Sequence, residues 1–221
     1  MNLHRKLACL VAVSLLGVTT ALGQYKVEGV STPASPDIPK SLQDLLDSQG
    51  TRVVDGQGST LCEIWLRKAV PANPNPSNSS DILYGVLAEG TFQGVLHFPA
   101  PGADFRGQAI KPGYYTLRYA LIPQDGNHMG VNPYRDVLVL GPVAADTAPD
   151  TALKFDGLVK LSRQASGTPH PALLVMGQVN GDSFPSVVKD DQGHWNLQVK
   201  LHGQNGDVPV AVTVVGKWEA Q

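Results

Sequence analysis

The chain has 221 residues, of which 42% are hydrophobic and 16% are charged. This length and composition allow one large domain or two smaller ones with a packed core, and they argue against intrinsic disorder. The 23 glycines and 17 prolines fall between short apolar runs, a distribution that favours many strands and turns over a helical protein.

Residues 1–23 have the features of an export signal. A basic start precedes an apolar run at residues 7–18, and the small residues Ala21 and Gly23 follow. This is the order of a cleaved secretory signal peptide, and the apolar run is too short to span a bilayer comfortably. We therefore expect a mature protein that starts near Gln24 and is exported to the periplasm or the extracellular space.

Cleavage would change the charge and the cysteine content. Residues 1–23 contain Arg5 and Lys6 and no acid, so the 17 basic residues fall to 15 against 19 acidic ones, a net charge of −4. The absence of a basic stripe argues against nucleic acid or an anionic membrane as a partner, and we expect no membrane insertion of the mature chain. Cys62 is then the single cysteine, and its alternation with Ile64 and Leu66 predicts a buried, inert thiol.

Residues 24–50 are predicted to be an extended lead-in with a short helix near its end. Residues 24–40 are rich in Pro, Ser and Thr, which favours an extended or disordered segment. Leucines at positions 42, 45 and 46 have helical spacing, and Gly50 supplies a stop. We expect this helix to flank the main domain.

About ten strands are predicted in the domain at residues 51–221. Each is a short run rich in β-branched or aromatic residues, bounded by turn residues. They are expected at residues 51–54, 59–70, 82–88, 91–98, 105–110, 114–122, 137–140, 172–179, 184–189, 194–201 and 208–218. The fold class predicted is mainly β, a single antiparallel β-sandwich with one amphipathic helix and the short N-terminal helix. A split near residue 145 into two pieces is the alternative, in which each piece would bury a thinner core.

The amphipathic helix is predicted as an insertion near residues 150–166. Apolar residues recur through this segment at helical spacing, and Gly167 supplies the stop. Asp146 or Asp150 is expected to cap its first turn.

The segment Ile110–Leu140 contains the candidate functional site. Two strands, both expected in the interior of the sheet, flank a polar loop at residues 123–136. The candidate ligand-binding residues are Arg118, Asp125, Asn127, His128, Tyr134, Arg135 and Asp136. Because an unpaired charge is costly on a covered surface, we expect Arg118 to have an acidic partner or to lie at the sheet edge.

The leading hypothesis is a non-catalytic binding protein. Asn132, Tyr134 and Arg135 are of the types that recognise carbohydrate, peptide or carboxylate ligands on sandwich scaffolds. The loop at residues 123–136 is therefore predicted to bind a small molecule, a glycan or a protein. A purely structural interpretation competes with this one: Asp125 and Asn127 would cap the turn, and Arg135 would pair with an acid.

The side chains of the loop would also suit two other functions. In a hydrolase, His128 would be the general base and Asp125 or Asp136 would orient it, but no G-x-S-x-G or H-E-x-x-H motif supplies the rest of an active site. In a metal protein, the same side chains and Asn127 would supply ligands. Their spacing matches no known metal-binding pattern, so we predict neither a metal nor a cofactor.

Three blocks of the sequence carry a resemblance. Leu61–Lys68 (LCEIWLRK), Leu83–Phe98 (LYGVLAEGTFQGVLHF) and Ile110–Leu140 resemble an uncharacterised group of exported bacterial proteins, a domain of unknown function. The phrase IKPGYYTLRY is also similar to the start of a strand in pre-albumin-like and carboxypeptidase-regulatory-like modules. The resemblance implies an exported bacterial β-sandwich and carries no activity with it.

Overall fold

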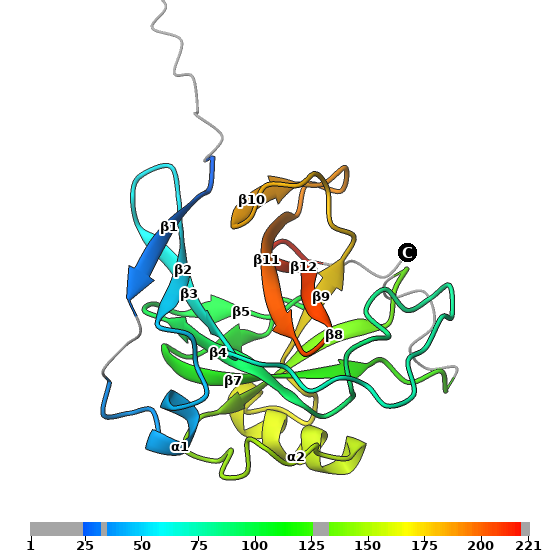
Figure 1. Cartoon of the computed structure of the whole chain (residues 1–221). Coiled ribbons are helices and arrows are strands. Elements are labelled where there is room, and N and C mark those ends of the chain that lie inside the picture. The colour runs from blue at the N-terminus through cyan, green and yellow to red at the C-terminus, as the bar shows by residue number, and fades with distance from the viewer. Residues whose placement is uncertain (1–23, 32–34, 126–132, 218–221) are drawn as a thin grey trace, which may run out of the picture.

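A computed structural model describes residues 24–31, 35–125 and 133–217. Within these residues the chain forms twelve strands and two short helices. Ten of the strands pair into one antiparallel sheet, which curls until it is nearly barrel-shaped (Figure 1). The prediction of a mainly β, antiparallel fold with two helices is confirmed.

In the large sheet, the first seven strands follow one another in chain order, and the last three follow in reverse chain order. From one edge to the other it contains β1 (Lys26–Ser31), β2 (Gln49–Val54), β3 (Thr60–Leu66), β4 (Phe92–Phe98), β7 (Gly113–Leu121), β8 (Asp136–Pro142), β9 (Leu173–Gly177), β12 (Gly206–Val215), β11 (Trp195–Gly203) and β10 (Ser186–Lys189). A small second sheet pairs β5 (Gly102–Ala103) with β6 (Ala109–Ile110). The helices are α1 (Lys40–Gln43) and α2 (Phe155–Ser166).

The main core lies on the inner face of the curled sheet. Successive side chains of a strand point to opposite faces, so alternate residues of each strand reach this core. Its members come from strands at both ends of the sheet, for example Ile64, Leu96 and Leu117 on one side and Leu197 and Val210 on the other. One continuous apolar cluster therefore joins the first and second halves of the chain.

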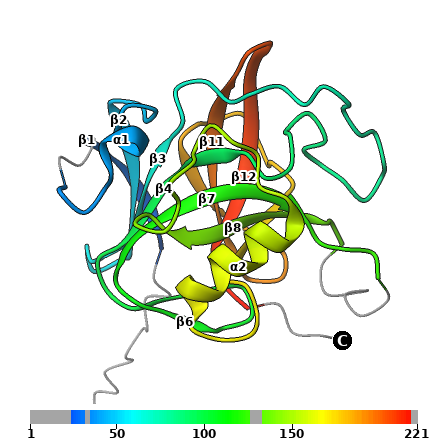
Figure 2. The same cartoon turned by 90° about the horizontal axis from the view of Figure 1, so that it is seen from below.

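Both helices cover the outer face of the same sheet, at the bottom of Figure 1. Leu42 of α1 belongs to a cluster with Trp65, Phe92 and Val95. Leu158 of α2 belongs to a second cluster over β7, β8 and β9, and Figure 2 shows α2 lying across β7 and β8. Among the residues that the structure describes, no helix is long and apolar enough to cross a membrane.

The central pair of strands is where the sequence places it. β8 pairs along its whole length with Tyr115–Leu121 of β7, with Leu117 opposite Leu140, and both are interior strands. Cys62 is 1% exposed within the inner core, and burial together with the charge of Glu63 raises the pKa of its thiol to about 12. The predicted burial of this thiol is confirmed, and its lack of reactivity in the folded state stays a prediction.

One strand prediction is wrong and another is only partly correct. Residues 82–88 form no strand, because the carboxylate of Asp136 accepts the backbone N–H groups of Leu83 and Tyr84 that a neighbouring strand would otherwise bind. The lead-in, predicted to be extended or disordered, contains β1, which pairs with β2 along the edge of the sheet. The strand expected at residues 105–110 is reduced to its last two residues.

The α2 prediction is correct for the helix and its end, but wrong for its start. Gly167 ends the helix in the left-handed conformation, with φ of 66°. The residue before the helix is Lys154, and no side chain caps the first turn. Asp146 instead forms an ion pair with Arg118 of β7, and Asp150 forms one with Arg67, which follows β3, because a buried guanidinium needs a carboxylate more than an exposed helix end does.

Candidate functional site

Arg118, one of the predicted binding residues, is fully buried and fully paired. Its Nε and Nη2 atoms donate to the two carboxylate oxygens of Asp146, at 2.7 and 2.6 Å. Nη1 donates to the carbonyl oxygens of Gly90 and Thr151, and Nη2 also donates to that of Ala148. A guanidinium has five N–H groups, and these five bonds use all of them. Arg118 therefore holds the loop after β8 against the outer face of the sheet.

Asp136 is also fully buried, and its carboxylate accepts hydrogen bonds on the inner face of the sheet. Its Oδ1 accepts hydrogen bonds from the backbone of Tyr84 and the hydroxyl of Tyr119, and its Oδ2 accepts one from the backbone of Leu83. Burial raises the pKa of Tyr84 to about 12, and burial and the charge of Asp136 raise that of Tyr119. Asp136 therefore fixes the turns at residues 82–88 beneath the sheet.

Arg118 and Asp136 do not converge on one site. The side chain of Arg118 points to the outer face of β7, whereas that of its neighbour Tyr119, which bonds Asp136, points to the inner face. The sheet therefore lies between the two charged groups.

Tyr134 and Arg135 lie at the end of the polar loop and bond to neighbouring segments. The hydroxyl of Tyr134 accepts a hydrogen bond from the side chain of Gln178. The Nε atom of Arg135 donates to the carbonyl of Ile122 at 2.7 Å, and its Nη1 lies 3.6 Å from a carboxylate oxygen of Asp81. The expectation that Arg135 pairs with an acid is confirmed, with Asp81 as the acid.

Asn127 and His128 lie outside the described residues, so the hydrolase and metal hypotheses that use His128 stay predictions. Within residues 24–31, 35–125 and 133–217, no group of three or more His, Cys, Asp and Glu side chains could hold a metal ion. Asp125 is described, and it lies at the edge of a pocket.

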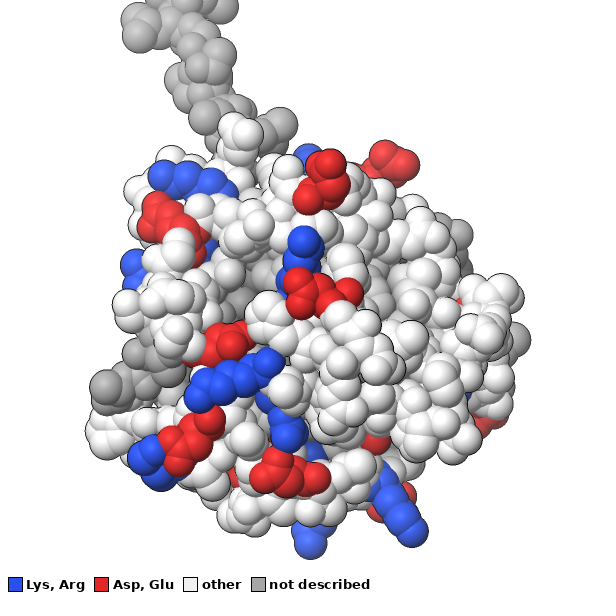
Figure 3. Space-filling view, in the orientation of Figure 1, with Lys and Arg blue, Asp and Glu red and all other residues white. Residues whose placement is uncertain are grey.

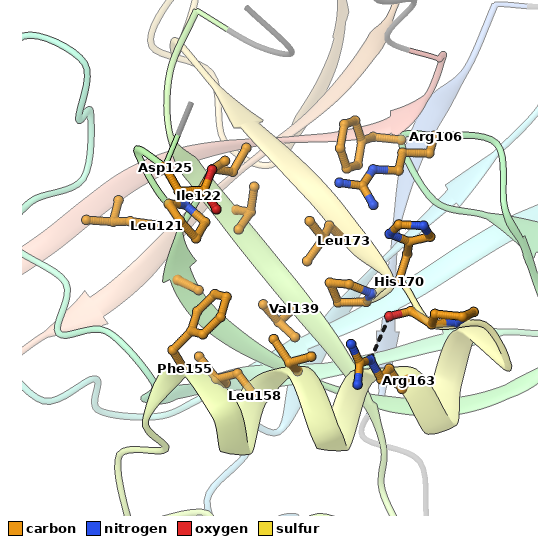
Figure 4. Close-up of a pocket in the computed structure, with 17 residues that line it drawn as sticks. Arg106, Leu121, Ile122, Asp125, Val139, Phe155, Leu158, Arg163, His170 and Leu173 are labelled. Carbon is orange, nitrogen blue, oxygen red and sulfur yellow. Dashed lines mark hydrogen bonds between the residues drawn. The ribbon is translucent and has the colours of Figure 1, made fainter. Parts of the chain in front are cut away.

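This pocket lies between α2 and the outer face of β7, β8 and β9, and we call it the α2 pocket (Figure 4). Its volume is about 310 Å³. Apolar side chains of the sheet form its floor, and α2 forms one wall. The floor and wall include Ala120, Val137, Val139, Leu173, Phe155 and Leu158.

The pocket exists because α2 touches the sheet on one side of the helix and leaves its flank open. Leu158, Leu161, Ser162 and Ala165 face the sheet and are buried. Phe155, Val159 and Arg163 follow one another at intervals of four residues and line the pocket. Phe155 is 54% exposed, so an aromatic side chain at the pocket mouth is left half in water.

Two contacts fix the position of α2. The hydroxyl of Ser162 accepts a hydrogen bond from the backbone N–H of Ala172 at 2.8 Å and donates one to its carbonyl oxygen at 3.0 Å. Gly141 of β8 lies so close to the helix that a Cβ atom there would be 2.5 Å from Cγ of Leu161. The helix is therefore anchored to the sheet in its C-terminal half.

Charged side chains differ between the two ends of the pocket. Arg106, Arg163 and His170 lie together at one end, and Asp125 and Phe155 lie at the other (Figure 4). The sequence shows the apolar face of α2, and His170 follows the end of this helix by four residues, but the sequence does not place Arg106 beside it. Arg106 comes from the loop between β5 and β6, which only the fold brings to the helix.

A second titratable cluster forms a row across the outer face of four strands. Arg52, Glu63, His97 and Tyr114 are successive cross-strand neighbours. The carboxylate of Glu63 accepts from Nε of Arg52 at 2.7 Å and lies 2.9 Å from Nδ1 of His97, whose ring stacks on Tyr114. Cross-strand pairs of this kind stabilise a sheet.

Trp65 of the same face is 1% exposed and packs beside α1.

No protein-family model, no curated protein and no solved structure matches this chain. The resemblance to exported bacterial domains of unknown function therefore stays a prediction.

Proposed function

We propose that this chain is an exported, non-catalytic β-sandwich protein that binds a small, mainly apolar molecule in the α2 pocket. The observation that carries the proposal is the open apolar space between α2 and the sheet, with the aromatic ring of Phe155 half exposed at its mouth. Apolar concave sites with a few polar groups are the usual form of small-molecule sites.

The size and lining of the pocket support this function. Small-molecule sites range from about 300 to 1,000 Å³, and the pocket has about 310 Å³. At roughly 30 Å³ for each heavy atom, the liquid volume of one water, it has room for about ten non-hydrogen atoms. A ligand that covers the ring of Phe155 and the side chains of Val139 and Leu173 removes apolar surface from water, which favours binding.

The polar loop predicted as a binding loop borders the same pocket. Pro123 and Asp125, its first residues in the described part of the chain, both line the α2 pocket. We propose that the loop contributes to binding through this end, while Arg118, Arg135 and Asp136 serve the scaffold.

The scaffold and its location are part of the proposal. The apolar cluster that joins strands from both halves of the sheet supports a sandwich, and the pattern of residues 1–23 supports export to the periplasm or beyond. Acidic and basic side chains are interspersed on the face shown in Figure 3, and the mature net charge of −4 fits a small-molecule ligand better than nucleic acid.

A neutral fluorescent probe tests the proposal. 1-Naphthylamine, a fluorophore that is neutral at pH 7 and close in size to the pocket, should give a saturable rise in fluorescence with the wild-type protein, and Phe155→Ser should weaken its binding about fivefold or more, because an aromatic contact with the ligand is lost. Val86→Ser is the matched control, since Val86 is 51% exposed and lies outside the α2 pocket. Absence of saturable binding, or equal weakening by both substitutions, would contradict the proposal.

A further inference from the structure

We infer that the ligand of the α2 pocket is a small amphipathic carboxylate, such as a medium-chain fatty acid. Its apolar chain would lie between α2 and the sheet, and its carboxylate would meet Arg106 and Arg163. This inference rests on the proposed function and adds the chemical class of the ligand.

The basic side chains at one end of the pocket support this inference. Arg163 and His170 come from the last turns of α2 and the loop that follows it, Arg106 comes from the loop between β5 and β6, and all three lie at that end (Figure 4). In the part of the chain that the structure describes, neither guanidinium forms an ion pair with a carboxylate. Arg118, Arg67, Arg52 and Arg135, by contrast, each have an acidic partner. A ligand carboxylate would supply the partner that these two arginines lack among the described residues.

The second evidence is the arrangement of the two guanidinium groups. The Nε atom of Arg163 donates to the carbonyl oxygen of Pro169 at 2.6 Å, which fixes the plane of the guanidinium and leaves its two terminal amino groups for a ligand. The guanidinium of Arg106 lies over the ring of Phe105, 5.3 Å from its centre. Arginine matches the two oxygens of a carboxylate with two parallel hydrogen bonds, and such charge-assisted bonds are stronger than neutral ones.

The third evidence is the apolar space beside the charged end. Val139, Leu158 and Leu173 line the pocket between the arginines and Phe155. The space for roughly ten non-hydrogen atoms equals the size of an eight-carbon acid, octanoate, with its two oxygens.

The opposite end of the pocket fixes the orientation of such a ligand. Phe155 lines that end, and its ring offers a contact for the end of an apolar chain. The headgroup is therefore expected at the Arg106 and Arg163 end.

Isothermal titration with three ligands of equal chain length tests the inference on the mature protein. Octanoate should bind about tenfold or more tightly than octanol, because two charge-assisted hydrogen bonds are added, and octylamine should bind most weakly. The preference for octanoate should shrink at high salt, since Arg106 is partly exposed and Arg163 is exposed.

Paired substitutions locate the headgroup. Arg106→Gln with Arg163→Gln should reduce octanoate affinity about tenfold or more and leave octanol affinity within about twofold. Lys160→Gln is the matched control, because Lys160 is an exposed cation of the same helix that does not line the pocket. It should leave octanoate affinity unchanged.

The outcomes separate the two proposals. Equal affinity for octanoate and octanol, or equal effects of the arginine and lysine substitutions, would overturn the carboxylate assignment while 1-naphthylamine still binds. Failure of that neutral probe as well as of all three ligands would overturn the binding function itself.

Discussion

At the scale of single residues, the candidate binding residues that are buried serve the scaffold. Arg118 uses all five of its N–H groups within the protein, and two of them bind Asp146. A strand that is apolar on both faces indicates that such a charge must be paired, and this much could be predicted. The identity of the partner could not, because Asp146 lies 28 residues away on a loop whose path depends on the whole sheet.

The Arg118–Asp146 pair gives a prediction about stability. Asp146→Ala should lower the free energy of unfolding by about 3–5 kcal/mol, because it leaves a buried guanidinium without its counter-charge. Asp150→Ala is the matched control: Asp150 also pairs with an arginine, but its side chain is 72% exposed, so about 1 kcal/mol or less should be lost. Urea denaturation of both variants measures the difference, and equal losses would show that burial of the pair is unimportant.

Cys62 gives a prediction about reactivity and alkaline pH. Because the folded state raises its pKa from 9.0 to about 12, the thiol should not react with Ellman's reagent at pH 8 until the protein is unfolded in urea. The free energy of unfolding should be unaffected by this group below pH 9. It should fall between pH 9 and 12, by up to about 1.4 kcal/mol per pH unit, because only the unfolded state then releases the proton.

The same experiment needs a variant, because Tyr84 also has a raised pKa. Urea midpoints of the wild type and of Cys62→Ala, compared from pH 8 to pH 11, isolate the cysteine. The variant should lose less stability across this range. Rapid labelling of native Cys62, or identical pH profiles of the two proteins, would contradict the prediction.

At the scale of elements, the strands with clear alternation were predictable and the irregular segments were not. β7, β8, β11 and β12 occur where their patterns indicate. Residues 82–88 have a strand-like composition, yet Asp136 takes the backbone groups of Leu83 and Tyr84 and holds them in turns. Local pattern cannot reveal a carboxylate that arrives from 52 residues away.

The position of α2 depends on its closest approach to β8. Gly141→Ala would place a Cβ atom 2.5 Å from Cγ of Leu161, so it should lower the free energy of unfolding by about 1–3 kcal/mol. The double variant Gly141→Ala with Leu161→Ala removes the clash, so it should be more stable than the sum of the two single losses implies. Thermal denaturation of the four proteins measures this coupling. Strictly additive losses would mean that the helix does not rest on Gly141.

At the scale of the whole molecule, the continuous inner core makes one unfolding unit the expected behaviour. The core joins strands on both sides of residue 145, where the sequence allows a split. Trp65 lies in the first part and Trp195 in the second. Variants that keep either one of these as the single tryptophan should each show fluorescence and circular dichroism transitions at the same urea concentration. Separate midpoints for the two probes would indicate two independently unfolding pieces.

The candidate site also depends on the fold of the whole molecule. The sequence indicates the apolar face of α2 and the polar loop that begins at Pro123, and both border the pocket. It does not indicate that Arg106 lies at the same end as Arg163 and His170, because the loop between β5 and β6 reaches α2 only in the complete fold.

The most direct test of ligand binding in the α2 pocket is a methyl NMR titration of the mature protein with octanoate. The methyl signals of Val139, Leu158 and Leu173, which line the α2 pocket, should shift together and saturate on one binding curve. Those of Leu197 and Val199 in the inner core should stay unchanged. Absence of a saturable shift at the three pocket residues, or larger shifts in the inner core, would contradict binding in the α2 pocket.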